Sequence, residues 1–573
     1  MRAPALFTSL TRGYKRGWLR GDVIAGLTVW AVLIPESLAY ASIAGVSPVV
    51  GLYAVPGALL LYAAFGSSRQ LVTGPGAATA ALSAAAVGDL AGGGSGAFVQ
   101  LTITLALTVG ILAIVAGLLR FGFVANFISA PVMKGFIIGL ALTIIVGQIP
   151  KLFGLPKGEG NFFRQLWDFL TNLGGTSGLT LLVGLLSLAL VLALKRWLPV
   201  VPASLAAVLL GIVAVHLFSL DQHGVEIIGH IQSGLPSFGL PNVAAHSYLH
   251  LVPAAIGVML VGFAEALGAA KTYAEKEHYE IDPNRELIGL GAANLGAGLL
   301  SGMVVAGGLS KTAVNATAGA RSQLSGLVVA GLTVVTLLFL TGLFEDLPEA
   351  TLAAVVISAL IDLVDIPSLV RLYKLHTAGL GRIYGFAARV DFISALAALF
   401  GVLIFDTLPG LFIGICVSIV LLLYRASKPN VAVLGKAPGS DGEFHDLRRN
   451  PHDEPVPGVV VLRVESGLFF ANADAVRKTL LAHAGAGTKA IVIDGETVPF
   501  IDVTAAQMLE AAAEELDGEG VQLLLARDVG QVRDILHRQE ADHPITIHAY
   551  PTVKAAVTAA LEPSTKKPEP VTA

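Results

Sequence analysis

The chain has 573 residues, of which 54% are hydrophobic and only 14% are charged. A soluble protein has roughly a quarter of its residues charged, so this composition excludes a soluble protein and indicates a polytopic membrane protein. The net charge of −4 carries no functional information as an average, and a single cysteine, Cys416, excludes an intramolecular disulfide.

The N-terminal region, residues 1–21, contains five basic side chains and no apolar run. We expect it to be cytoplasmic, without a cleavable signal peptide. Fourteen apolar segments follow, and the third and the tenth are too short to cross a bilayer, which takes about 20 helical residues. The segments are predicted at about 22–44, 48–66, 76–89, 98–118, 124–147, 178–195, 202–219, 249–270, 285–302, 311–319, 321–342, 349–364, 388–405 and 408–425.

The basic residues between these segments are unevenly distributed. If the N-terminus is cytoplasmic, every second connection should be cytoplasmic and positively charged. These connections contain Arg69, Arg120, Lys195, Arg196, Lys271, Lys276, Arg321, Arg371, Lys374, Arg382, Arg425 and Lys428. The opposite connections contain basic residues in one long loop, at Lys151, Lys157 and Arg164. The pattern predicts a multi-pass protein of the inner (plasma) membrane with both termini in the cytoplasm.

The two short segments occupy matching positions, each being the third member of a set of seven. Interrupted segments at matching positions of two halves indicate a transporter binding site between inverted repeats. We predict repeats at about 22–219 and 249–427, with opposite orientations because each contains an odd number of segments. The alternative is that glycine-rich membrane helices serve close helix packing.

The stretch Val304–Gly319 leads into the tenth segment with two adjacent glycines, a hydroxyl pair and a lysine. Non-helical backbone inside a membrane is tolerated only where protein covers it or where it lines a cavity. We predict extended backbone from Val304 to Ser310 and a half-helix from about Lys311. Its free amides, its dipole and the lysine would attract an anion. The alternative is an ordinary loop, with Lys311 snorkelling to the interface.

Two glutamates lie inside predicted membrane segments, Glu36 in the first and Glu265 in the eighth. The first and eighth segments match in the two repeats, so both carboxylates could approach one site at the midplane. An ionisable residue in the membrane is a functional hypothesis by default, and we predict that both glutamates carry protons, with Lys311 as a partner when substrate is absent. The alternative is a static Glu–Lys pair that stabilises the bundle.

After Lys428 the composition changes. Residues 428–457 are polar and rich in proline, glycine and charge, which predicts a linker. Residues 458–562 alternate strand and helix patterns, which predicts a small α/β domain with strands that include Val459–Val464 and Leu468–Phe470. The tail, 563–573, is predicted to be disordered.

Several motifs, taken in order, resemble the SulP family of sulfate permease-like anion transporters, which is solute carrier family 26 in animals. They are Pro35–Ala41, Gly51–Tyr53, Thr73–Pro75, Asn284–Asn294, Ser310–Asn315 and Gly319. Gly467–Ala473, Ile491–Asp494 and Phe500–Thr504 resemble the STAS domain that ends these transporters. The resemblance covers nearly the whole chain.

The resemblance implies a polytopic α-helical membrane protein with fourteen segments in two inverted seven-segment repeats, forming UraA-like core and gate domains, and a cytoplasmic STAS domain. It also implies a homodimer, an elevator-like motion and an anion bound between the third and tenth half-helices. The predicted substrate site consists of Glu36, Tyr40, Thr73, Gly74, Gly76, Ala77, Ser310, Lys311 and Thr312, and the predicted proton-coupling residues are Glu265 and Glu36.

The sequence departs from many relatives at two of these positions. Many have glutamine in place of Glu36, and animal members often have arginine in place of Lys311. A second carboxylate beside an anion site repels the substrate unless it is protonated, which favours proton coupling. Lysine lacks the planar fork of arginine, which weakens the expectation of sulfate selectivity. Sodium-dependent bicarbonate carriers of this family typically have aspartate at the Glu265 position and a threonine where this chain has Ala269, so sodium coupling ranks second.

The expected function is proton-coupled secondary transport of sulfate, bicarbonate or a dicarboxylate. The alternatives are a sodium-coupled bicarbonate symporter, an uncoupled exchanger or channel, and a membrane-tethered signalling protein with the STAS domain as its output. Thr504 matches a phosphorylatable position of related STAS proteins, or else it caps the following helix. The STAS domain is expected to have a cytoplasmic partner. No nucleotide-binding loop, metal-ligand cluster or catalytic triad is visible, so we expect no enzyme activity, cofactor, metal or nucleic-acid partner.

Overall fold

The computed structural model describes residues 14–562, except for 89, 91–94, 128, 159, 199–200, 232, 375–388, 406, 441 and 541–546. The chain divides into two compact units. One, which we call the membrane unit, contains Met1–Leu375 and Asp391–Ser418. The other, which we call the α/β unit, contains His376–Val390 and Ile419–Ala573. The predicted tail at 563–573 and the first 13 residues lie outside the described residues.

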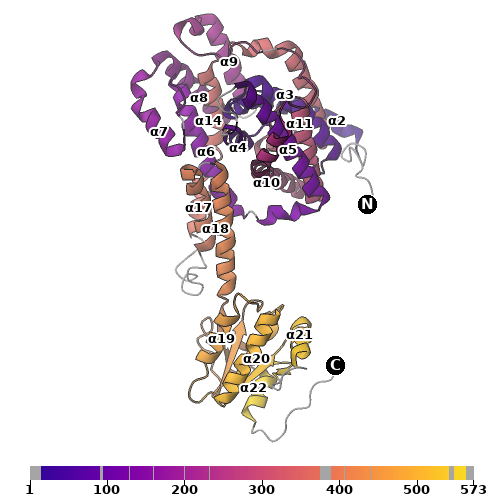
Figure 1. Cartoon of the computed structure of the whole chain (residues 1–573), viewed down its shortest axis with the longest axis vertical. Helices are drawn as coiled ribbons and strands as arrows, with labels where there is room; N and C mark the ends of the chain where they lie inside the picture. Colours follow the sequence, from indigo (N-terminus) through magenta and orange to yellow (C-terminus); the bar gives the residue numbers. More distant parts are fainter. Residues whose placement is uncertain are drawn as a thin grey trace. The chain divides into compact units, whose positions relative to one another are not determined.

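Fourteen helices match the predicted apolar segments in order (Figure 1). Nine of the described helices are long and apolar enough to cross a membrane. The first repeat contains α2 (Leu19–Ile43), α3 (Pro48–Phe65), α4 (Ala77–Gly88), α5 (Ser95–Leu118), α6 (Ala130–Leu152), α8 (Gly178–Trp197) and α9 (Ala203–Phe218). The second contains α10 (Ala245–Lys276), α11 (Pro283–Leu299), α12 (Leu309–Thr317), α13 (Leu324–Val335), α14 (Glu349–Ile361), α17 (Val390–Phe405) and α18 (Thr407–Ser427).

Both repeats are interrupted at their third segment by a short strand. Strand β1 (Thr73–Gly74) pairs antiparallel with β2 (Ala306–Gly307), and each strand leads directly into a half-helix, α4 or α12. With 12 and 9 residues, α4 and α12 span about 18 and 14 Å and cannot cross a bilayer. Because the strands are antiparallel, the N-termini of the half-helices approach the strand pair from opposite sides. The extended segment and the half-helix are confirmed, although α12 begins two residues before Lys311.

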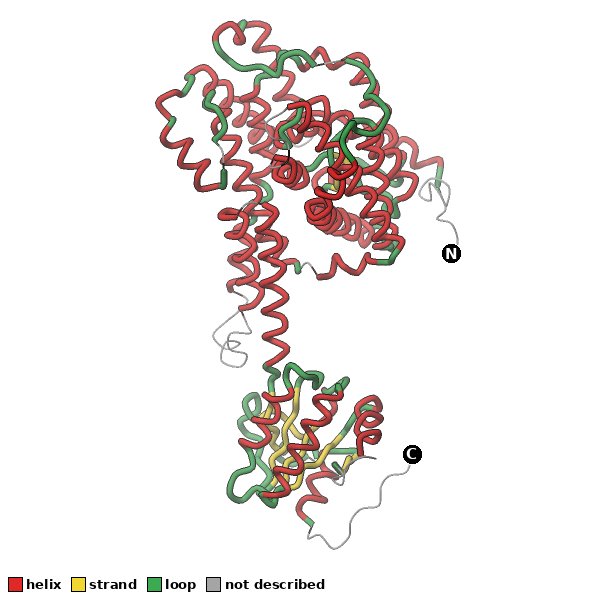
Figure 2. The backbone as a smooth tube through the Cα atoms, in the orientation of Figure 1, coloured by secondary structure: helices red, strands yellow, loops and turns green. Residues whose placement is uncertain are grey.

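The helices of the membrane unit form the core and gate domains of a UraA-like fold. In the core, α2 to α5 pack with α10 to α13, and in the gate α6, α8, α9 and α14 pack together. Figure 2 shows that this unit is almost entirely helical and that the large sheet belongs to the other unit. Glycines permit close contacts between core helices, because a Cβ on Gly57 of α3 would lie 2.2 Å from the carbonyl oxygen of Gly296 on α11.

Two short helices of the membrane unit are not among the fourteen predicted segments. Helix α7 (Phe162–Thr171) follows α6, and α15 (Ile366–Lys374) follows α14. They therefore follow the fifth segment of each repeat. The membrane unit also contains 3-10 helices at Arg16–Trp18, Phe121–Phe127, Leu173–Gly175, Leu220–His223 and Thr341–Phe344, and a π-helix at Thr336–Leu340.

The second unit contains a six-stranded sheet with the order β4-β3-β5-β6-β7-β8. Strands β5 to β8 are parallel to one another, while β3 is antiparallel to both β4 and β5. One face packs against α19, α20 and α21, and the other against α22. The bounds are β3 (Val431–Lys436), β4 (Phe444–Asp446), β5 (Val459–Val464), α19 (Ala473–Ala482), β6 (Ala490–Asp494), α20 (Val503–Gly518), β7 (Gln522–Ala526), α21 (Gly530–Glu540), β8 (His548–Tyr550) and α22 (Val553–Leu561), with a 3-10 helix at Gly495–Thr497.

Two expectations for this unit are wrong. The segment 428–457 is not simply a linker, because β3 and β4 lie in it and extend the sheet beyond β5. Its alternating apolar residues Ala432 and Leu434 are buried, which anchors the segment despite its polar composition. The predicted strand Leu468–Phe470 is not formed, since Leu468 makes only an isolated bridge with Ile501.

Candidate anion site

The structure gathers the predicted charged and aromatic site residues from three helices around the two short strands. Glu36 and Tyr40 lie on α2, Glu265 lies on α10, and Lys311 lies in the first turn of α12. Helix α12 packs against α2, and α10 packs against α4, α12 and β2. The tenth segment of the sequence therefore meets the first and the eighth in space, and both of these also contact the third.

Lys311 is the central cation of this cluster and is 4% exposed. Its ammonium donates a hydrogen bond to the carbonyl oxygen of Pro75, which links α12 to the segment that precedes α4. The same nitrogen lies 5.4 Å from the centre of the Tyr40 ring, a distance suited to a cation–π contact. A Cβ on Gly74 would lie 3.7 Å from it, so the backbone of β1 lies beside the ammonium.

The two glutamates act on Lys311 from a distance. Lys311 interacts electrostatically with both Glu36 and Glu265, and Tyr40 lies in the field of both carboxylates. Among the described side chains, neither glutamate forms an ion pair with Lys311 within 4 Å. Glu36 is buried, and its Oε2 has no hydrogen-bond partner among the protein atoms described. Glu265 is partly buried. The static Glu–Lys pair is therefore not formed in this structure.

The other predicted substrate residues differ in their accessibility. Thr73, Gly74 and Ala77 are buried, Gly76 is partly buried and Ser310 is exposed. The hydroxyl of Thr73 has no hydrogen-bond partner in the described part of the protein. A buried polar atom without a partner is costly, so the free oxygens of Thr73 and Glu36 indicate unused hydrogen-bonding capacity beside the strands.

Thr312 also has a structural role that the sequence pattern did not reveal. Its hydroxyl accepts a hydrogen bond from the Val72 amide at 3.2 Å and donates one to the Gly308 carbonyl at 2.7 Å. Asn315, one turn later, donates to the carbonyl of Gln70 at 2.8 Å. Together these bonds fix α12 to the extended segment that leads into α4.

The Asn284–Asn294 motif supports the same region from α11. The side chain of Asn294 donates to the Val305 carbonyl at 2.9 Å and accepts from the Val305 amide at 3.0 Å, so it holds the backbone just before β2. At the other end of the motif, the buried carboxylate of Glu286 accepts hydrogen bonds from Tyr62 at 2.7 Å and from the Ser67 amide at 2.8 Å. These polar groups position the site and need no contact with substrate.

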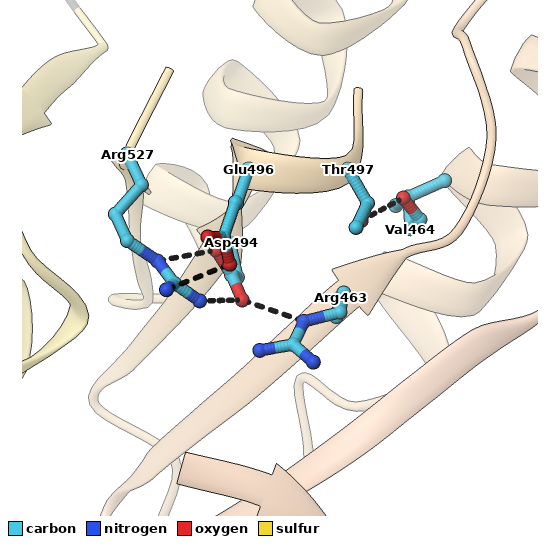
Figure 3. Close-up of polar contacts among 6 residues, drawn as sticks. All are labelled: Arg463, Val464, Asp494, Glu496, Thr497 and Arg527. Atoms are coloured by element: carbon cyan, nitrogen blue, oxygen red, sulfur yellow. Dashed lines mark hydrogen bonds and ion pairs between the residues drawn. The ribbon is translucent and has the colours of Figure 1, made fainter. Parts of the chain in front are cut away.

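A second charged cluster lies in the α/β unit, at the carboxyl ends of three parallel strands (Figure 3). The fully buried Asp494 accepts hydrogen bonds from Arg463 at 2.7 Å and from Arg527 at 2.6 and 3.0 Å, and Arg527 also pairs with Glu496 at 2.7 Å. Burial opposes the charge on Arg527, but its contacts with the two carboxylates outweigh burial and raise its pKa. This cluster joins the ends of β5, β6 and β7.

Thr504 is exposed in the first turn of α20. The residue that caps this helix is Asp502, whose Oδ1 accepts a hydrogen bond from the Ala505 amide at 2.8 Å. The alternative reading of Thr504 as the cap is therefore wrong, and its phosphorylation stays a prediction. Within the described part of the chain, no group of three or more His, Cys, Asp or Glu side chains could hold a metal ion.

Inverted repeats that meet at two interrupted segments, with a buried cation at the start of one half-helix, are an architecture of membrane transporters. Residues 19–384 match the model of the sulfate permease family, and residues 450–556 match the STAS domain. The chain belongs to the sulfate permease family. It is an anion transporter of that family, and the family consists of transporters rather than enzymes.

Relatives in bacteria and plants match most of this chain. A probable sulfate transporter of Mycobacterium tuberculosis is 36% identical over 92% of both chains, and high affinity sulfate transporter 2 of Stylosanthes hamata is 29% identical over 92% of this chain and 81% of its own. The structure of murine Solute Carrier 26 family member A9 has a TM-score of 0.87 at 22% identity, covering 97% of this chain and 94% of its own. The transmembrane domain of the cyanobacterial bicarbonate transporter BicA has a TM-score of 0.58 at 22% identity, covering 71% of this chain and 98% of its own.

Proposed function

We propose that the chain is a proton-coupled secondary transporter of a small oxyanion or carboxylate, with sulfate, bicarbonate and dicarboxylates as the candidate substrates. The observation that carries the proposal is the position of Lys311, a buried cation at the start of α12 that lies in the field of two carboxylates without pairing with either. The curated relatives named above as sulfate transporters make sulfate the first candidate.

The charges of the site give a physical reason for coupling. Glu36 and Glu265 together carry one more negative charge than Lys311 neutralises, so an entering anion is repelled while both are ionised. Protonation of one glutamate removes this repulsion. An anion would then bind together with a proton, held by Lys311 and the amides at the starts of α4 and α12.

We propose that transport follows an elevator-like alternating-access motion, in which the core carries the site relative to the gate. The protein would act as a homodimer in the inner (plasma) membrane, with both termini in the cytoplasm. The core suits a rigid-body movement because its interrupted segments are joined by side chains. Lys311, Thr312 and Asn315 all bond to the segment between Gln70 and Pro75.

The experiment is uptake of labelled sulfate, bicarbonate and fumarate into proteoliposomes. Each anion is tested with an inward proton gradient, with a sodium gradient and with neither, for the wild type, Glu265→Gln and Glu36→Gln. Glu275→Gln is the matched control, because it lies on the same helix as Glu265 but is exposed near its end. We expect one anion to accumulate with the proton gradient, and this accumulation to disappear in Glu265→Gln and persist in Glu275→Gln.

Each other outcome selects a different function. Accumulation driven by sodium would indicate a sodium-coupled bicarbonate symporter. Uptake that follows only the anion gradient would indicate an exchanger or channel. A folded protein that moves none of the three anions would favour a membrane-tethered signalling protein with the STAS domain as output. Proton-driven uptake that survives in both glutamate variants would refute the coupling role of these carboxylates.

A further inference from the structure

The two short helices α7 and α15 occupy equivalent positions in the inverted repeats, and they contact opposite ends of one gate helix. The ring of Phe153, which caps the end of α6, lies 5.0 Å from the ring of Phe169 on α7. Near the other end of α6, Lys134 donates a hydrogen bond to the Ser368 hydroxyl of α15 at 3.0 Å. With 23 residues, α6 is about 34 Å long, which is close to the thickness of the hydrocarbon core. The two short helices therefore lie at opposite surfaces of the membrane.

Helix α7 has an apolar stripe that the protein does not cover. Phe163, Trp167 and Leu170 have the spacing i, i+4, i+7, and they are 50%, 68% and 51% exposed. Next to this stripe, the helix carries the charged residues Arg164 and Asp168. A helix between two membrane-spanning helices with such a stripe, including a tryptophan, is typical of the membrane–water interface.

Helix α15 has three sides with different chemistry. Its protein side contains Ser368 and Leu369, which are buried. A second side exposes Ile366, Val370 and Tyr373 at spacings that place them on one stripe. Between these two sides lie the basic residues Arg371 and Lys374, both exposed.

Basic side chains outnumber acidic ones around α15. Arg371 donates to the Ser368 hydroxyl at 2.8 Å, so its guanidinium and the Lys134 ammonium converge on one oxygen. Asp365 is the carboxylate that pairs with Arg371, at 4.0 Å. Asp391 lies in the first turn of α17, next to Phe392, whose ring is 5.4 Å from that of Tyr373. With Lys374 included, three cations face these two carboxylates, so a net positive charge lies next to an exposed apolar stripe.

We propose that α7 and α15 are interfacial helices that anchor the gate to the two leaflets, and that α15 binds the headgroups of anionic phospholipids with Arg371, Lys374 and Lys134. Only the assignment of α15 to the cytoplasmic leaflet rests on the orientation proposed above. Anionic lipids of that leaflet attract basic segments at its surface. A gate held at both surfaces resists tilting while the core moves, so the anchoring supports an elevator motion.

The headgroup assignment is tested by lipid retention. Full-length protein is purified from phosphatidylcholine/phosphatidylglycerol liposomes, and the bound phosphatidylglycerol is counted by native mass spectrometry. At about 1 kcal/mol for each basic residue near the surface, Arg371→Gln/Lys374→Gln should weaken retention roughly 10- to 30-fold. The matched control is Arg448→Gln/Arg449→Gln, which removes the same charge from the α/β unit and should retain the wild-type amount. Equal retention in the two double variants would overturn the headgroup assignment.

The depth of the helices is tested by fluorescence quenching in the full-length protein. Bimane is attached to Val370→Cys, or to Arg448→Cys as the soluble reference, in a Cys416→Ala background. Spin-labelled lipids should quench the first label and leave the second unchanged, and equal quenching would overturn the placement of α15.

For α7, Trp167 is kept while Trp18, Trp30 and Trp197 are changed to Phe, and brominated lipids should quench the emission of Trp167. An unquenched Trp167 would overturn the placement of α7. Neither test uses transport, so these results stand apart from the proposed function.

Discussion

At the scale of single residues, Lys311 is the position where loss of charge should affect transport most. It is the only buried lysine or arginine among the described residues. It lies at the start of α12 and donates a hydrogen bond to the Pro75 carbonyl. A hydrogen bond to a charged group contributes about 1.5–3 kcal/mol, so Lys311→Gln should lower the initial uptake rate by roughly 10- to 150-fold.

The Lys311 prediction is measured as uptake of the identified anion against its concentration. Lys311→Arg is the companion variant, because it keeps the charge and adds a planar fork that suits oxyanions. We expect it to retain part of the uptake and to shift preference towards sulfate. Wild-type uptake by Lys311→Gln would show that the cation does not hold the substrate.

Asp494 is the residue whose loss should most destabilise the α/β unit. It is fully buried and receives three hydrogen bonds from Arg463 and Arg527, which stay charged when the carboxylate is removed. Breaking a buried ion pair costs about 3–5 kcal/mol, and the lower end applies here because both arginines are partly exposed. Hydrogen exchange on the full-length Asp494→Asn variant should show faster exchange of the β6 amides. The control Asp474→Asn, at an exposed i,i+4 pair, should leave that exchange unchanged.

At the scale of elements, the contact between α3 and α11 should not tolerate a methyl group. A Cβ on Gly57 would lie 2.2 Å from a backbone oxygen of Gly296, so the helices must separate. Overpacking typically costs about 1–3 kcal/mol, and Gly57→Ala should lower the thermal unfolding midpoint of the purified protein. Gly331→Ala is the control, since no atom lies within 4 Å of that Cβ on α13. Equal midpoints for the two variants would contradict the close packing.

Most elements of the membrane unit could be predicted because a bilayer demands long apolar runs, and all fourteen predicted segments have a matching helix. Helices α7 and α15 were missed because they are short and amphipathic, without an apolar run. Strands β3 and β4 were missed because prolines, glycines and charges surround their few buried residues. The pairing of β3 with β5 depends on a partner more than 20 residues later, which local composition does not reveal.

The sequence predicts which residues form the candidate site, but it does not predict which atoms these residues bond to. The glycines and Lys311 stand out in the sequence because they are unusual inside a membrane segment. The acceptor of Lys311 is a backbone carbonyl, that of Pro75, and a carbonyl has no sequence signature. Likewise Thr312 has a hydroxyl suited to substrate, yet only the fold shows that this hydroxyl bonds to the Val72 amide.

At the scale of the whole molecule, the inverted repeats fix which loops share a side of the membrane. Nine segments lie between the loop with α7 and the α/β unit, so we expect these two parts to be on opposite sides of the membrane, whichever side each is on. The proposed orientation adds that the α/β unit is cytoplasmic. Single cysteines test both statements, because Cys416 is the sole native cysteine and can be replaced by alanine.

Two exposed positions serve as reporters, Asn172→Cys at the end of α7 and Glu465→Cys after β5. A membrane-impermeant maleimide applied to intact cells should label Asn172→Cys alone, and permeabilised cells should show labelling of both. The reverse pattern would keep the inverted repeats but overturn the orientation, and with it the placement of the basic helix α15 in the cytoplasmic leaflet. Labelling of both positions in intact cells would contradict the inverted repeats themselves, because seven segments per repeat cannot place these loops on one side.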